Sequence, residues 1–71
     1  MNVAQHEKLQ AATVAYIEAF TRMRGFAPSV RDVAAKFRIT VHAALCRLRT
    51  LRRHGRVDWV DGLARTLRVL P

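Results

Sequence analysis

Hydrophobic residues recur every three or four positions along the first part of the chain, which is the pattern of a helix with one buried stripe. This pattern predicts a helix over about 3–24, with the side chain of Asn2 as its cap and Gln5 three residues further on. Gly25 is expected to end the helix, because glycine adopts the positive φ of a C-cap at little steric cost. The buried stripe is expected to contain Leu9, Thr13 (through its methyl group), Tyr16, Ile17, Phe20 and Met23.

A second helix, over about 30–37, is predicted after a short extended segment. Pro28 keeps the chain extended because it disfavours the α region in the residue before it. Ser29 can cap the new helix, and Asp32 three residues later makes a near variant of the capping box. Residues 37–39 leave room only for a turn. The inner stripe of this helix is expected to contain Val30, Val33, Ala34 and Phe37.

A third helix is predicted over about 41–54, with Thr40 as its cap and Gly55 as its stop. On a helical wheel centred on Leu48, the inner face holds Val41, Ala44, Leu45, Leu51 and the stem of Arg52. The outer face holds His42, Ala43, Cys46, Arg49, Thr50 and Arg53, with Arg47 to one side. The helix therefore combines a buried face with a basic, hydrogen-bonding face that contains no acidic residue.

After Gly55 the hydrophobic period changes to two, which is the pattern of β-strands. Asp61-Gly62 is a strong signal for a two-residue turn, so a hairpin is predicted over about 56–70. Two strands alone are only marginally stable, so the apolar side chains of the hairpin must pack on the helices. These side chains are Val57, Trp59, Leu67 and Val69. The predicted fold class is mainly α with a small β-hairpin, a three-helix winged helix-turn-helix forming a single domain of residues 1–71.

Basic residues are concentrated in the second half of the chain. Nine of the thirteen Lys and Arg residues fall between Lys36 and Arg68, and only Asp58 and Asp61 oppose them there. This segment therefore carries +7 of the net charge of +8. A GC-rich genome would explain the preference for Arg over Lys, but not the excess of bases over acids. The expected partner is a polyanion, and double-stranded DNA fits a helix and a hairpin that gather the charge.

Several other functions are not supported by the residues. No apolar run approaches the ~20 residues of a membrane span, and no signal peptide is evident, so a cytoplasmic location is expected. No nucleophile with a base, carboxylate pair or phosphate loop is present, so no enzyme activity and no small-molecule ligand are expected. His42 and Cys46 could supply two metal ligands, but no third ligand is near them, so no metal or other cofactor is expected.

The order of several short motifs resembles the DNA-binding domain of LexA-type repressors, from about Leu9 to Leu70. The motifs are Gly25-Phe26-Ala27-Pro28-Ser29, Val33-Ala34, Ala43-Ala44, Leu48, Leu51, Arg53-x-Gly55 and Gly62-x-x-Arg65-x-Leu67-Arg68-x-Leu70. The resemblance implies a winged domain that recognises an operator half-site in the major groove. It also implies contacts from the start and outer face of the third helix. The matching positions are Thr40, His42, Ala43, Leu45 and Cys46.

The chain departs from the family pattern in two ways. The family's recognition helix usually carries Asn and acidic residues where this chain has His42, Leu45 and Cys46, so the family's operator sequence cannot be carried over. The self-cleaving Ser/Lys protease and most of the dimer interface of LexA-type repressors lie in a C-terminal half without a counterpart in these 71 residues. The resemblance therefore extends to DNA binding and not to self-cleavage.

The expected function is sequence-specific binding of double-stranded DNA by a repressor-like transcriptional regulator, of a size compatible with a phage or mobile element. A homodimer or a partner repressor would supply the second half-site. Two alternatives remain open, a protein-interaction module for a host regulator or polymerase and a non-specific architectural DNA binder. Arg68 could also pair with Asp58 rather than with DNA. The expected DNA-binding residues are Ser29, Arg31, Thr40, His42, Ala43, Leu45, Cys46, Arg47, Arg49, Arg53, Arg65 and Arg68.

Overall fold

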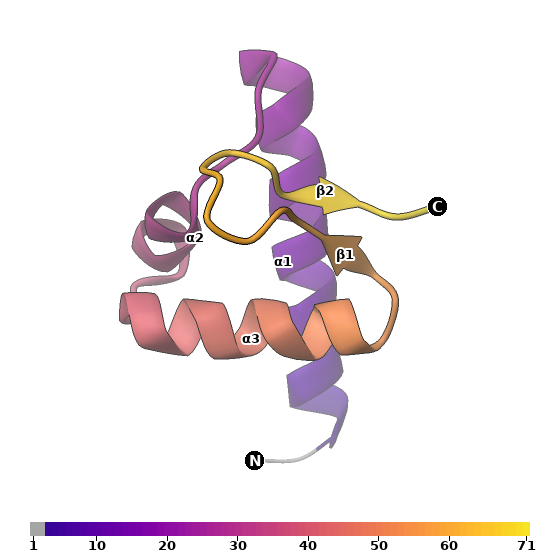
Figure 1. The fold of residues 1–71 in the computed structure, drawn as a ribbon. Coiled ribbons are helices and arrows are strands. Elements are labelled where there is room, and N and C mark those ends of the chain that lie inside the picture. The colour runs from indigo at the N-terminus through magenta and orange to yellow at the C-terminus, as the bar shows by residue number, and fades with distance from the viewer. Residues whose placement is uncertain (1–2) are drawn as a thin grey trace.

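The computed structural model describes residues 3–71, with side chains from residue 7 onward. Its elements are α1 (Val3–Arg24), α2 (Val30–Phe37), α3 (Val41–Arg53), β1 (Val57–Asp58) and β2 (Arg68–Val69). The two strands form one antiparallel sheet. In Figure 1, α1 runs behind the other elements, α3 lies across it, and α2 and the strands lie on the same side of α1 as α3. The expected fold class, mainly α with a small sheet in winged helix-turn-helix order, is confirmed.

The core lies where α1, α2, α3 and the sheet meet. Its fully buried side chains come from all four: Ile17, Val33, Leu48, Leu51 and Val57. The expected stripe of α1 is wrong at Met23, which is 83% exposed, whereas Val14 is buried. At 100° per residue, Met23 lies about 120° around the helix from Ile17, so it points away from the core. The predicted cap Asn2 lies outside the described residues.

Local hydrogen bonds set the helix ends. Ser29 and Asp32 form a complete capping box, in which Ser29 Oγ accepts the Asp32 N–H at 3.1 Å and the Asp32 carboxylate accepts the Ser29 N–H at 2.9 Å. Thr40 Oγ1 caps α3 by accepting the N–H of Ala43 at 3.0 Å. Gly25 ends α1 at a φ of +79°, as its sequence position predicted. These caps fix where α2 and α3 begin.

The turn between α2 and α3 depends on a left-handed residue that is not glycine. Arg38 has a φ of 55° and a ψ of 46°, and its N–H closes the end of α2. Such a conformation costs an L-residue with a side chain roughly 1–2 kcal/mol. The expected inner face of α3 is also wrong at Val41, which is 47% exposed, while Leu45 is half-buried. Val41 lies in the first turn of α3, beyond the part that packs on the core.

The prediction of a tight two-residue hairpin is wrong. Val57 pairs with Val69 and Asp58 with Arg68, so a long segment separates the strands. We call this segment, residues 59–67, the wing loop. Asp61 and Gly62 do form a turn, closed by the Leu63 N–H and the Val60 carbonyl at 3.1 Å. Beyond that turn the Thr66 hydroxyl accepts the Val60 N–H at 2.8 Å and donates to the Val60 carbonyl at 3.3 Å. These main-chain groups therefore do not pair with the opposite strand, and the ladder does not extend.

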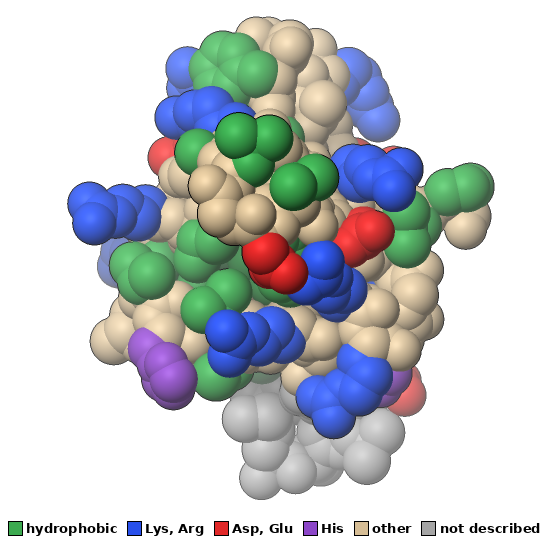
Figure 2. All heavy atoms as spheres, viewed as in Figure 1, with side chains coloured by type: hydrophobic (Ala, Val, Ile, Leu, Met, Phe, Trp, Pro, Cys, Tyr) green, Lys and Arg blue, Asp and Glu red, His purple; other side chains and the backbone are tan. Residues whose placement is uncertain are grey.

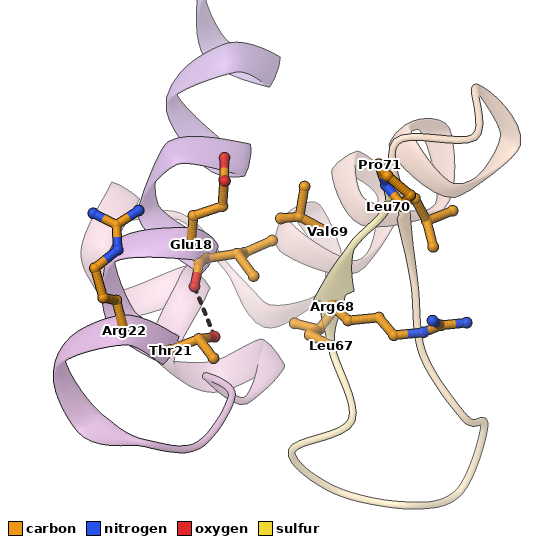
Figure 3. Close-up of a pocket in the computed structure, with 9 residues that line it drawn as sticks. Glu18, Thr21, Arg22, Leu67, Arg68, Val69, Leu70 and Pro71 are labelled. Carbon is orange, nitrogen blue, oxygen red and sulfur yellow. Dashed lines mark hydrogen bonds between the residues drawn. The ribbon is translucent and has the colours of Figure 1, made fainter.

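The sheet packs on α1 through its second strand. Leu67, the residue just before β2, is buried, and Val57 in β1 is fully buried. Figure 3 shows the shallow groove where the C-terminal segment faces α1, with Thr21 bonded to the Ile17 carbonyl. The labelled lining residues are Glu18, Thr21, Arg22, Leu67, Arg68, Val69, Leu70 and Pro71. None of the helices in the described residues is both long and apolar enough for a membrane crossing.

Candidate nucleic-acid interface

The outer face of α3 brings together half of the residues predicted from the sequence. Thr40, His42, Ala43, Cys46, Arg49 and Arg53 are all exposed. Residues 42, 46, 49 and 53 form one row along the helix, because steps of three and four residues share a face. Leu45 borders this row and is half-buried. In Figure 2, Lys and Arg side chains are spread over the surface formed by α3, with a histidine near the end where the helix begins.

Arg49 and Arg53 carry the unneutralised charge of this face. No hydrogen bond or salt bridge engages either guanidinium within the part of the chain that the structure describes. Each presents a planar fork of N–H donors that matches a phosphate or the paired acceptors of a guanine edge. The face is therefore electropositive and rich in free donors.

His42 and Cys46 lie one helical turn apart at the N-terminal end of the row. Cys46 Sγ is 3.6 Å from His42 Nε2, and the Thr50 hydroxyl donates to the Cys46 carbonyl at 3.1 Å. Both side chains can donate or accept hydrogen bonds at a base edge. Among the described residues, no group of three or more His, Cys, Asp and Glu side chains is placed to hold a metal ion.

Arg47 is turned away from this row. Its Nη1 lies 3.5 Å from the Thr13 hydroxyl of α1, and its guanidinium carbon lies 5.2 Å from the ring centroid of Phe37 in α2. The side chain thus connects α3 with the two other helices. The structure does not bring Arg47 together with Arg49 and Arg53.

The start of α2 is a second exposed cationic position. Arg31 is exposed, and no ion pair engages it among the described residues. The capping box occupies the N–H groups of Ser29 and Asp32, and within the described residues the N–H groups of Val30 and Arg31 have no partner. The backbone N–H of Ser29, with Arg65 nearby, lowers the pKa of Asp32, so this carboxylate stays charged.

The two predicted arginines of the hairpin are both engaged within the domain. Arg65 Nη1 donates to the Ala27 carbonyl at 3.1 Å and to Asp32 at 3.3 Å, and its guanidinium stacks 4.8 Å from the Phe26 centroid. Arg68 lies 3.7 Å from Asp58, which is the alternative considered from the sequence. Arg65 points back toward the α1–α2 connection, whereas most of the Arg68 side chain remains exposed.

Arg52 is the residue of this region whose role the sequence did not reveal. Its guanidinium donates to Asp58, to Asp61 and to the Trp59 carbonyl, and lies 4.1 Å from the Trp59 ring centroid. The backbone N–H of Trp59 and then Arg52 lower the pKa of Asp58. The sequence did contain a signal for this role, because the acid-free helix α3 is followed closely by Asp58 and Asp61.

Two helices joined by a short turn, the second with an exposed basic face, are followed here by a two-stranded sheet. This order defines a winged helix-turn-helix, a class of DNA-binding domain. The family model of the LexA DNA-binding domain matches residues 6–66, and the chain belongs to this family. The resemblance noted in the sequence is thereby confirmed.

Several similar proteins are LexA repressors of the genus Thermotoga. The chain is 40% identical over 60 residues to the LexA repressor of Thermotoga petrophila, 38% to that of Thermotoga maritima and 37% to that of Thermotoga neapolitana. Each match covers 84% of this chain and about 30% of the relative's length. The similarity is thus to one part of these repressors.

Proposed function

We propose that this domain reads an operator half-site in duplex DNA on behalf of a transcriptional repressor, with α3 in the major groove. The observation that carries the proposal is the exposed, acid-free row on α3 with the unpaired Arg49 and Arg53. The major groove of B-DNA is wide enough, at about 12 Å, to admit such a helix. Membership of the LexA DNA-binding family supports the same reading.

Within the groove the outer face of α3 makes two kinds of contact. His42, Ala43 and Cys46 near the start of α3 approach base edges, because recognition helices meet the bases with their N-terminal residues. Arg49 and Arg53 bind guanine bidentately or bind flanking phosphates. Thr40 reaches a phosphate beside the first turn.

The start of α2 binds the DNA backbone. In helix-turn-helix domains the helix before the recognition helix crosses the phosphates, and helix N-termini attract anions. Arg31 and the free N–H groups of Val30 and Arg31 supply these contacts. Arg68, exposed on β2, is the candidate phosphate contact of the wing, and Arg65 supports the wing from inside the domain.

Two copies of the domain are expected on one operator. A single module of this kind buries only roughly 600–1,000 Å², so a second half-site about 34 Å away would supply the missing affinity. The second half-site would be bound by another copy of this chain or by a partner repressor. A palindromic site would indicate the former.

Selection from random duplexes tests the proposal. We expect a consensus with a preserved half-site, and a loss of affinity on substituting Arg49→Ala and Arg53→Ala together. The slope of log affinity against log salt should fall by about two units, one for each lost phosphate contact if both bind phosphate. Arg22→Ala, an exposed arginine of α1, is the matched control and should change neither quantity.

The same measurements separate the proposal from its rivals. Unchanged affinity in a folded double variant would remove α3 from the interface. A steep salt slope without sequence preference would instead indicate an architectural DNA binder.

A further inference from the structure

One arginine of α3 faces the wing rather than the outer surface. Arg52 Nε donates to Asp58 Oδ1 at 2.9 Å, and Nη2 donates to the Trp59 carbonyl at 2.8 Å. Nη1 lies 3.4 Å from both carboxylate oxygens of Asp61. In Figure 2, two acidic side chains lie on either side of a basic one just above α3. All three nitrogens of the Arg52 guanidinium therefore form hydrogen bonds with residues 58–61.

The aromatic ring of Trp59 completes this arrangement. The guanidinium carbon of Arg52 lies 4.1 Å from the ring centroid, and the indole N–H donates to Asp61 Oδ1 at 2.9 Å. A planar guanidinium can stack on a ring and fill several acceptors at once, which an ammonium cannot do. The contacts specify an arginine at position 52.

The returning half of the wing loop has its own attachment. Arg65 binds the Ala27 carbonyl and Asp32, and stacks on Phe26. The loop is thus held to α3 at its beginning and to the α1–α2 connection near its end. Between these two points its side chains are apolar or acidic, with Val60 57% and Leu63 61% exposed. The tip offers no cation to a phosphate.

We propose that Arg52 is a positioning residue for DNA binding, which fixes the wing loop relative to α3 without contacting DNA itself. The proposal rests on the proposed function. A loop joined by strands of two residues each is not ordered by its ladder alone, since short two-stranded hairpins are marginal in water. Because Arg52 holds the wing loop in place in the free domain, DNA binding does not have to order the loop, and the entropic cost of ordering is avoided.

The neighbouring residue supplies a matched control. Arg53 follows Arg52 in the same helix, is the same residue type, and points to the outer face without a partner among the described residues. Arg52→Met and Arg53→Met both keep an unbranched stem and remove one positive charge. Their effects on the free domain and on DNA binding should differ in kind.

In the free domain, the fluorescence of Trp59, the single tryptophan, reports on the contact. Arg52→Met should shift its emission and speed hydrogen exchange of the wing-loop amides, while far-UV circular dichroism keeps its helical signal. Arg53→Met should change none of these. Unchanged Trp59 emission in Arg52→Met would overturn the proposed contact without any reference to DNA.

On DNA, Arg53→Met should lower the affinity and reduce the salt slope by about one unit, provided that it meets a phosphate. Arg52→Met should lower the affinity about tenfold through lost preorganisation, leave the salt slope unchanged, and lose footprint protection only beside the wing. Arg52→Lys keeps the positive charge but lacks the planar guanidinium that binds several acceptors at once. It should therefore behave like Arg52→Met.

Three results would overturn the positioning role. The first is a salt slope reduced in Arg52→Met, which would make Arg52 a direct phosphate contact. The second is full rescue by Arg52→Lys, which would mean that charge alone matters. The third is a wild-type domain that binds no duplex, which would overturn the proposed function and the DNA role together, while the Trp59 emission would still decide whether Arg52 holds the wing.

Discussion

The carboxylate of Asp32 in α2 contacts Ser29 in the α1–α2 connection and Arg65 in the wing loop. Removing it therefore measures how much these contacts stabilise the folded domain. Asp32 Oδ2 accepts the backbone N–H of Ser29 at 2.9 Å and lies 3.3 Å from Arg65 Nη1. The first contact completes the cap of α2, and the second attaches the wing loop to the same point. Asp32→Ala deletes both contacts and leaves the Ser29 hydroxyl bond to the backbone of residue 32 in place.

The size of the effect follows from the two contacts. A hydrogen bond to a charged group contributes about 1.5–3 kcal/mol, and the lower end applies because the Asp32 side chain is 34% exposed. The ion pair with Arg65 is half-exposed and adds at most about 1 kcal/mol. Together they predict a loss of about 2 kcal/mol, which is a large share of the roughly 4–11 kcal/mol available to a domain of this length. The melting temperature should fall by roughly 10 °C.

The loss should depend on pH with a definite sign. The Ser29 N–H lowers the pKa of Asp32 in the folded state below the value of about 3.9 that an aspartate has when unfolded. The stabilisation is therefore fully present above that unfolded pKa, and it disappears as the pH falls through the lower folded value. The Asp58 pKa is lowered as well, so acid destabilises wild type and variant alike. The difference between the two proteins isolates Asp32.

Thermal unfolding followed by far-UV circular dichroism, from neutral pH down into the acid range, measures that difference. Asp32→Asn keeps the shape and one acceptor, so it should lose less stability at neutral pH than Asp32→Ala. Its stability difference from wild type should also shrink in acid, because only the wild type titrates at this position. Glu18→Ala, an exposed acid of α1, is the control for a change of net charge. The reasoning would be refuted if the difference in the free energy of unfolding between wild type and Asp32→Ala were the same in neutral and strongly acidic solution. A difference below about 0.5 kcal/mol at neutral pH would refute it as well.

Two substitutions test the scaffold that carries α3. Arg38→Gly should raise the free energy of unfolding by up to about 1 kcal/mol in urea titrations, because glycine removes the strain of the left-handed turn at φ 55°; a destabilised variant would show that the Arg38 side chain has contacts of its own. Leu48→Ala should cost about 2–5 kcal/mol in the same titration, because Leu48 is fully buried at the centre of α3; a loss below about 1 kcal/mol would mean that the core refills the space.

Helix ends were predictable from the sequence because neighbouring residues decide them. The side chains of Ser29 and Thr40 cap backbone groups three residues away, and Gly25 and Gly55 adopt positive φ angles where the helices stop. None of these interactions needs a distant partner. The α3 helix ends at Arg53, one residue before the sequence suggested, with His54 as its C-cap.

Burial at the element ends was not predictable in the same way, because it depends on what packs there. Met23 and Val41 follow helical periodicity, yet Met23 is 83% exposed and Val41 is 47% exposed. The wing loop shows the same limit. Asp61-Gly62 correctly indicated a turn, but the Thr66 hydroxyl, a partner six residues from Val60, kept the strands from extending to it.

The arginines pose the hardest case, since all of them look alike in the sequence and their partners separate them. Among the described residues, Asp58 and Asp61 are paired with Arg52, and Asp32 is paired with Arg65. In the described part of the chain, no salt bridge joins the row of residues 42, 46, 49 and 53 to these acids. Under the proposed function, Arg49 and Arg53 are therefore the α3 arginines available to DNA, and the charge that they supply is smaller than the net charge of the segment. Under the proposed function, this distribution assigns recognition of DNA to α3 and the positioning of the wing to Arg52 and Arg65.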